Sequence, residues 1–164
     1  MTVMHWTGAF VVVGALAVLT ASPAQAICSY KGQLYAKTTS AQELADSQWV
    51  VKARVIAADD HWSDKGDPWT SYHLQVLTAF KGVLPSRVDL FTYRNSGGFY
   101  LDKGMEHDIG REYLLYLNPA NADRGVPVAA RGATEVNYAC GQSKPWEGVS
   151  RADQQHLIAL SHGR

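Results

Sequence analysis

The sequence predicts a mainly β protein, a small closed or partly open barrel with short helices at its two ends. Five or six short segments alternate apolar and polar side chains, as half-buried strands do, and turn-forming residues separate them. A helix-capping pattern stands near each end of this series. The short strands are not interleaved with long helical segments, which favours a barrel over βαβ units.

The first 26 residues have the features of an export signal. The apolar run 10–19 is followed by Pro23 and then by Ala24-Gln25-Ala26, a small-x-small pattern after which signal peptidase cleaves. A membrane-spanning helix needs about 20 apolar residues, so the run is too short to favour a span. We expect cleavage after residue 26; a retained anchor or a misassigned start is the alternative.

The remaining chain, residues 27–164, is 164 − 26 = 138 residues long, the size of one domain. Such a chain buries close to 70% of its unfolded surface, enough for a proper core. The formal net charge of zero argues against a surface that binds polyanions over the whole molecule, so no nucleic acid is expected. We expect a single secreted or periplasmic domain.

Cys28 and Cys140 are the two cysteines of the sequence. In an exported chain, two cysteines indicate one disulfide. It would close a loop of about 110 residues, which constrains the unfolded state by at most about 5 kcal/mol. The new amino terminus would then be fastened to the end of the fold. The other possibility is a pair of unbonded, buried thiols.

The two expected helices each begin with a capping signal. Ser40 and Glu43 have the Ser-x-x-Glu spacing that satisfies free amides at a helix start, which predicts a helix over residues 40–47. Ser150 and Asp153 repeat this signal and open a terminal helix, whose apolar residues are Leu157, Ile158 and Leu160.

The expected strands follow the two-residue alternation of side chains. They cover residues 49–56, 72–80, 87–93 and 112–117, with weaker strands near 126–130 and 134–138. The first of them is expected to stop at Asp59-Asp60, before a segment rich in turn formers. In the second, His73 is expected on the outer surface, opposite Tyr72.

Two loops carry residues that could contact a partner. Trp62 and Trp69 lie in the polar segment 59–70, and exposed aromatic side chains often anchor a partner, although both could instead fold back onto the barrel. Gly97 and Gly98 break the chain after the third strand and open a polar loop that runs to Gly110.

No catalytic, metal or cofactor site is predicted. The histidines lack HxH and HExxH spacing, and the sequence has no Gly-x-Ser-x-Gly elbow and no phosphate loop. Four polar residues of one loop could bind a cation, but solvated surface explains them better; they are Asp102, Glu106, His107 and Asp108.

Four motifs then follow one another in order. They are Ala-Asp-Ser-x-x-Val-Val-x-Ala-x-Val at 45–55, Tyr-x-Leu-x-Val-x-x-x-Phe-Lys-Gly at 72–82, Gly-x-x-Tyr-Leu at 110–114, and Cys140 with Pro145-Trp146-x-x-Val149-Ser150 and Gln154-Gln155. This series resembles the tissue inhibitors of metalloproteinases and related netrin-like domains over nearly all of residues 27–164. The resemblance implies an exported, non-enzymatic, five-stranded OB-type Greek-key barrel with flanking helices. It also implies that Cys28 pairs with Cys140.

The chain departs from these inhibitors at its amino terminus. Their first residue is a cysteine whose α-amine and carbonyl chelate the protease zinc. The matching position here is Ala26, and residues 95–110 contain no cysteine to pair with it. We therefore expect a non-catalytic module that binds a protein, and a metalloprotease inhibitor acting through the free amine of Ile27 is the alternative.

The expected partner-binding residues are Ile27, Cys28, Ser29, Tyr30, Trp62, Trp69, Gly97 and Gly98. A further alternative is an oligosaccharide-binding barrel, because OB folds bind sugars with stacked aromatic rings. Its platform would come from Tyr72, Phe91, Tyr93, Tyr113 and Tyr116, although one face of the strands must fill the barrel and most of these rings are expected in the core.

Overall fold

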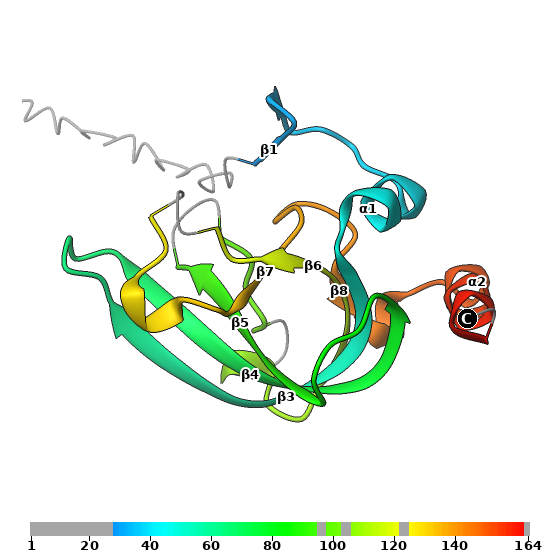
Figure 1. Cartoon of the computed structure of the whole chain (residues 1–164). Helices are drawn as coiled ribbons and strands as arrows, with labels where there is room; N and C mark the ends of the chain where they lie inside the picture. The colour runs from blue at the N-terminus through cyan, green and yellow to red at the C-terminus, as the bar shows by residue number, and fades with distance from the viewer. Residues whose placement is uncertain (1–27, 95–97, 103–105, 122–124, 163–164) are drawn as a thin grey trace, which may run out of the picture.

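The computed structural model describes residues 28–94, 98–102, 106–121 and 125–162 (Figure 1). The expected leader, Ile27 and Gly97 lie outside these residues. Within the described ranges the elements are β1 (Ser29–Tyr30), β2 (Gln33–Leu34), α1 (Ser40–Asp46), β3 (Trp49–Trp62), β4 (Pro68–Lys81), β5 (Arg87–Tyr93), η1 (Glu106–Asp108), β6 (Glu112–Pro119), η3 (Val128–Ala130), β7 (Thr134–Val136), β8 (Lys144–Pro145), η4 (Trp146–Gly148) and α2 (Arg151–His162).

Five of the described strands form a closed ring. β3 pairs with β4, β4 with β5, β5 with β7, β7 with β6, and β6 returns to β3. The β5–β7 pair is parallel, through Leu90 and Thr134, and the other four are antiparallel. β8 adds a short edge to β6. The prediction of a mainly β fold with a small ring of strands is confirmed.

The β3–β4 hairpin is longer than predicted. Each strand has fourteen residues, so pairing continues through Asp59 and Asp60 instead of stopping there. Both carboxylates find cross-strand partners: Asp59 Oδ2 lies 2.8 Å from His73 Nε2, and the hydroxyl of Thr70 donates to Asp60 Oδ1 at 2.6 Å. Cross-strand polar contacts of this kind offset the low strand propensity of Asp.

The weaker strand predicted over residues 126–130 is wrong. Val128–Ala130 forms a single 3-10 turn instead. Pro127 precedes it, and Pro has no N–H to give to a strand ladder. The other weak strand is real but shorter than predicted, Thr134–Val136.

The two helices are present, with one change of cap. Thr39, not Ser40, is the N-cap of α1, and it exchanges hydrogen bonds with Gln42. The side chain of Glu43 therefore takes no part in capping the helix, and it is buried. In α2 the predicted cap holds, because the amide of Asp153 donates to the hydroxyl of Ser150 at 3.1 Å.

Aromatic and aliphatic side chains fill the ring. Tyr72 and Tyr113 are fully buried inside it with the aliphatic residues of β3, β4 and β6. Tyr116 is buried on the other face of β6, against Phe80 and Leu157 of α2. Tyr72, Tyr113 and Tyr116 are therefore core residues, as expected for most of these rings, and are not exposed for sugar stacking. Figure 1 shows α1 and α2 at one end of the barrel and the tip of the β3–β4 hairpin at the other.

Candidate functional site

The described chain begins with a small hairpin that lies outside the ring. Ser29 and Tyr30 of β1 pair with Leu34 and Gln33 of β2. The turn between them places Lys31 and Gly32 at positive φ, 50° and 83°. The carbonyl of Cys28 accepts from the amide of Tyr35 at 2.8 Å and closes the hairpin.

A disulfide fastens this hairpin to the far end of the chain. Cys28 is bonded to Cys140, with their Cα atoms 6.0 Å apart and a separation of 112 positions in the sequence. Cys28 is only 3% exposed, whereas Cys140 is exposed, so the bridge runs from a buried residue to the surface. The predicted disulfide is confirmed.

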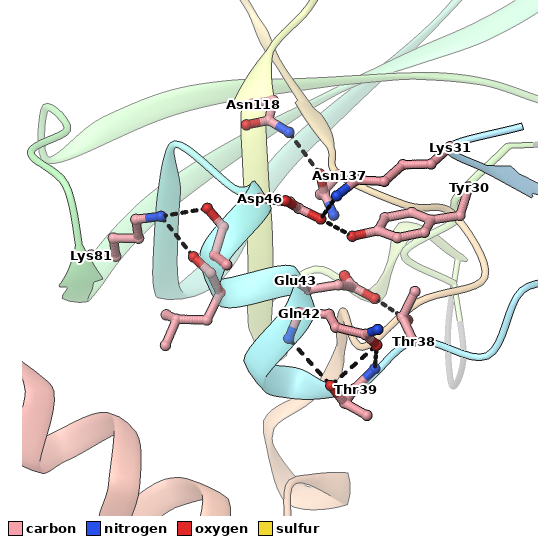
Figure 2. A network of polar contacts seen from close by, with 12 residues as sticks. Tyr30, Lys31, Thr38, Thr39, Gln42, Glu43, Asp46, Lys81, Asn118 and Asn137 are labelled. Atoms are coloured by element: carbon pink, nitrogen blue, oxygen red, sulfur yellow. Dashed lines mark hydrogen bonds and ion pairs between the residues drawn. The ribbon is translucent and has the colours of Figure 1, made fainter.

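A second anchor joins the hairpin to the last turn of α1. The hydroxyl of Tyr30 donates to Asp46, and Lys31 Nζ lies 2.6 Å from the same carboxylate (Figure 2). The hydrogen bond from Lys31, followed by that from Tyr30, lowers the pKa of Asp46. Burial, followed by the bond to Asp46, raises the pKa of Tyr30. The Tyr30 ring also packs against Tyr138, with ring centroids 5.2 Å apart.

A third anchor lies beneath the hairpin. The carboxylate of Glu43 is buried and accepts from the hydroxyl of Thr38 at 2.5 Å and from the amide of Gln142 at 2.8 Å. The side chain of Gln142 in turn donates to the carbonyl of Thr38 at 2.6 Å. Figure 2 shows Glu43 pointing from α1 toward Thr38. Burial raises the pKa of Glu43. The segment that connects the hairpin to α1 is therefore fixed at both ends.

The hairpin exposes two large apolar side chains. Leu34 is 60% exposed and Tyr35 is 53% exposed. Tyr35 also adopts a positive φ of 52°, which is uncommon for a bulky residue. These residues adjoin the predicted contact residues Cys28, Ser29 and Tyr30 but were not predicted. The Lys31-Gly32 pair between two short apolar stretches is the hairpin signal that could have found them.

The two tryptophans of the β3–β4 hairpin have opposite environments. Trp62 lies at the tip and is 74% exposed, as expected of a contact residue. Trp69 is 3% exposed. Its ring stacks on that of His61, with the ring centroids 4.0 Å apart, and packs against Phe91. Of the two alternatives, Trp69 therefore follows the one in which the ring folds back onto the barrel, into the cluster with Phe91 and Ala130, and it is not an exposed anchor.

Gly98 lies in the described segment 98–102, which contributes side chains to the core of the ring. The neighbouring side chains Phe99 and Leu101 are buried in the core, so this segment packs inward. A Cβ atom on Gly98 would collide with the carbonyl of Tyr93, and glycine is therefore required there for close packing. Its role in the described structure is in packing.

Three of the residues predicted as solvated surface, Asp102, His107 and Asp108, each pair with another side chain. The carboxylate of Asp60 lies 3.2 Å from His107 Nε2 and 3.7 Å from Arg94 Nη1. Arg94 Nη2 in turn lies 3.5 Å from the carboxylate of Asp102. Asp108 is buried, and the hydroxyl of Tyr113 donates to it, so the prediction of a solvated side chain is wrong there. Among the described residues, no group of three or more His, Cys, Asp or Glu is arranged to hold a metal ion.

The predicted contact residues do not form one continuous face. Cys28, Ser29 and Tyr30 lie on the tethered hairpin, whereas Trp62 is in the tip of the β3–β4 hairpin. Figure 1 draws β1 and that tip well apart. The best-defined candidate site is thus the tethered hairpin itself, with Leu34 and Tyr35.

Comparison with protein-family models and with curated protein sequences finds no match to this chain. In the part of the chain that the structure describes, no helix has the length and apolar character needed to cross a bilayer.

Proposed function

We propose that this chain is an exported, non-catalytic binding module that engages a protein partner through the tethered β1–β2 hairpin. The observation that carries the proposal is the exposure of Leu34 and Tyr35 on a hairpin fixed by a disulfide and by the Tyr30–Asp46–Lys31 cluster. Exposed apolar side chains on a rigid support are typical of protein-binding surfaces.

The rigidity of the hairpin is part of the proposal. A loop that must be ordered on binding loses free energy to that ordering, and a preorganised loop does not. Cys28 is held through Cys140, and Tyr30 is held through Asp46. Leu34 and Tyr35 are then presented in one conformation. An aromatic and an aliphatic side chain of this kind fit a shallow apolar pocket on a folded protein.

The ring supports an OB-type Greek-key assignment. Its order, β3-β4-β5-β7-β6 with return to β3 and a parallel β5–β7 step, is compatible with a five-stranded barrel of that class. The disulfide that pins the amino-terminal segment also agrees with a module similar to netrin-like domains. Disulfides persist in oxidising compartments, which supports a secreted or periplasmic location.

Site-specific photo-crosslinking tests the proposal. Benzoylphenylalanine is placed at Tyr35, in the full chain expressed in its source organism, and at Val83 as a control, because Val83 is 89% exposed but lies in the turn between β4 and β5. The partner crosslinked from Tyr35 is identified by mass spectrometry, purified and titrated. We expect a Leu34→Ser/Tyr35→Ser variant to bind it at least about tenfold more weakly. Equal crosslinking from Val83, or unchanged affinity of the variant, would contradict the proposal.

Metalloprotease inhibition is the second candidate, favoured by one observation. Cys28 is buried and bonded to Cys140, so a mature chain cleaved after residue 26 would begin one residue before a fixed position. The mature protein is titrated against a panel of zinc proteases, with and without acetylation of its amine. Inhibition that acetylation abolishes supports zinc chelation. An absence of inhibition across the panel leaves the plain binding module.

A further inference from the structure

A groove opens between α1 and α2 on the outside of the ring, away from the β1–β2 hairpin. It has a volume of about 640 Å³. Its walls carry small side chains, Ala41 and Ala45 of α1 and Ala159 of α2, while Leu44 and Phe80 form apolar surface between them. Ligand sites in proteins typically measure about 300–1,000 Å³ and are mostly apolar, so the groove has the size and lining of such a site.

The groove remains open although the core below it is well packed. Leu44 packs against the cluster that contains Phe80, Tyr116 and Leu157, and that cluster joins α2 to the ring. Above this layer, alanines face the space between the helices. Longer side chains at Ala45 and Ala159 would fill the groove.

One cation lies on the lining of the groove. Lys81, at the end of β4, donates from Nζ to the carbonyl of Leu44 at 2.6 Å and to that of Ala45 at 3.1 Å (Figure 2). These bonds hold the ammonium at the last turn of α1. An ammonium has three N–H donors, and the two carbonyls account for two of them. The group can therefore pair with an acceptor at the groove while it stays fixed to α1.

We propose that this groove binds a free single-chain amphiphile with an anionic head, such as an alkyl carboxylate. The tail lies against Ala45, Phe80 and Ala159, and the carboxylate pairs with Lys81. The apolar walls account for the tail, and the charge of Lys81 accounts for the sign of the head group. A membrane surface is disfavoured, because surfaces that bind anionic bilayers use clusters of Lys and Arg, and among the described residues the lining of this concave groove carries one lysine.

A smaller recess next to the groove fixes the direction of the ligand. This recess, of about 150 Å³, shares Ala41 and Leu44 with the groove and contains Asp153 and His156. Tyr116, whose hydroxyl is buried, also lines the recess. The carboxylate of Asp153 disfavours an anionic head there, because two like charges would lie close together. The ligand therefore places its head at Lys81 and not in the recess.

Titration calorimetry with dodecanoate, kept below its micelle-forming concentration, tests the proposal on the purified disulfide-bonded protein. We expect saturable binding of one dodecanoate, and no binding of dodecyltrimethylammonium, which has the same tail and the opposite charge. Lys81→Gln should weaken dodecanoate binding about tenfold, because a charge-assisted hydrogen bond is lost. Lys37→Gln, a change of an exposed lysine outside the groove, should leave the affinity within about twofold.

A second pair of variants tests the location of the tail. Ala159→Trp should fill the groove and weaken binding at least about tenfold, whereas Ala152→Trp, at an exposed position of α2 outside the lining, should have no effect. Both variants are checked for an unchanged unfolding transition. Equal binding of the two amphiphiles, equal effects of the two tryptophans, or binding only to phosphatidylglycerol vesicles and not to free dodecanoate would overturn the proposal.

Discussion

The backbone of Gly141 lies directly against the buried carboxylate of Glu43. A Cβ atom added to Gly141 would overlap that carboxylate. The next residue, Gln142, donates its amide to the same carboxylate at 2.8 Å, and the preceding residue, Cys140, carries the disulfide. This contact couples α1 to the turn that holds the amino-terminal hairpin.

We expect Gly141→Ala to destabilise the protein. The added methyl group must displace a buried, hydrogen-bonded carboxylate, and overpacking of this kind costs about 1–3 kcal/mol. The free energy of unfolding is measured by urea denaturation. Gly148→Ala is the matched control, because a Cβ atom there meets nothing within 4 Å. Equal stability of the two variants would show that the Glu43–Gly141 contact is not tight.

Removal of the disulfide should lower stability substantially. A bond between Cys28 and Cys140 closes most of the described chain into one loop, and loss of a native disulfide in a small secreted domain typically costs about 2–5 kcal/mol. The Cys28→Ser/Cys140→Ser variant is compared with the parent by urea denaturation. A loss below about 0.5 kcal/mol would mean that the bridge does not stabilise the fold.

The two tryptophans of the β3–β4 hairpin should respond in opposite ways to truncation. Trp69 is buried against Phe91, so Trp69→Ala should cost about 3–5 kcal/mol. Trp62 is 74% exposed, so Trp62→Ala should change stability by no more than about 0.5 kcal/mol. Thermal unfolding followed by circular dichroism separates the two cases. Similar losses at both positions would contradict the assignment of Trp69 to the core and Trp62 to the surface.

His73 should give the protein a pH-dependent stability. Hydrogen bonds to Asp59, followed by those to Asp89, raise the pKa of His73 above its ordinary value of 6.5. A folded-state pKa above the unfolded one stabilises the protein fully below about pH 6.5, and this contribution is lost as the pH rises through the folded-state value. The effect should stay below about 1 kcal/mol, because the side chain is 36% exposed and solvent screens the pairs.

The His73→Gln variant provides the check. Urea denaturation at several values between about pH 6 and pH 9 should show a smaller loss of stability with rising pH than in the parent. His156→Gln serves as the control, because His156 is exposed on α2. An unchanged slope in His73→Gln would rule out the Asp59–His73–Asp89 cluster as the source of the pH dependence.

Patterns among neighbouring residues predicted the elements that depend on interactions between residues close in sequence. Alternating side chains located β5 to the residue, and the Ser150–Asp153 cap located the start of α2. The N-cap of α1 is Thr39 and not the predicted Ser40, because the side chain of Glu43 accepts a hydrogen bond from Gln142, 99 positions away, instead of capping the helix. The extension of β3 through Asp60 likewise depends on Thr70 across the hairpin. Such tertiary contacts cannot be inferred from neighbours in sequence.

The candidate site was predicted in part for the same reason. The disulfide could be predicted because the sequence has two cysteines, Cys28 and Cys140, and both follow an expected export signal. The burial of Trp69 depends on packing against Phe91 and η3, which the alternation of β4 alone does not reveal. Leu34 and Tyr35 were missed because strands of two residues are too short for a periodic pattern.

Intact-mass spectrometry of the natural protein tests the tethered chain end most directly. We expect a single species that begins at Ile27. Its mass should be two hydrogens lower than that of the reduced form, because Cys28 and Cys140 are bonded. A mature protein that retains residues 1–26 would contradict the expected chain start. A mass that does not change on reduction would contradict the tether, since the hairpin that presents Leu34 and Tyr35 would then lack its covalent link to Cys140.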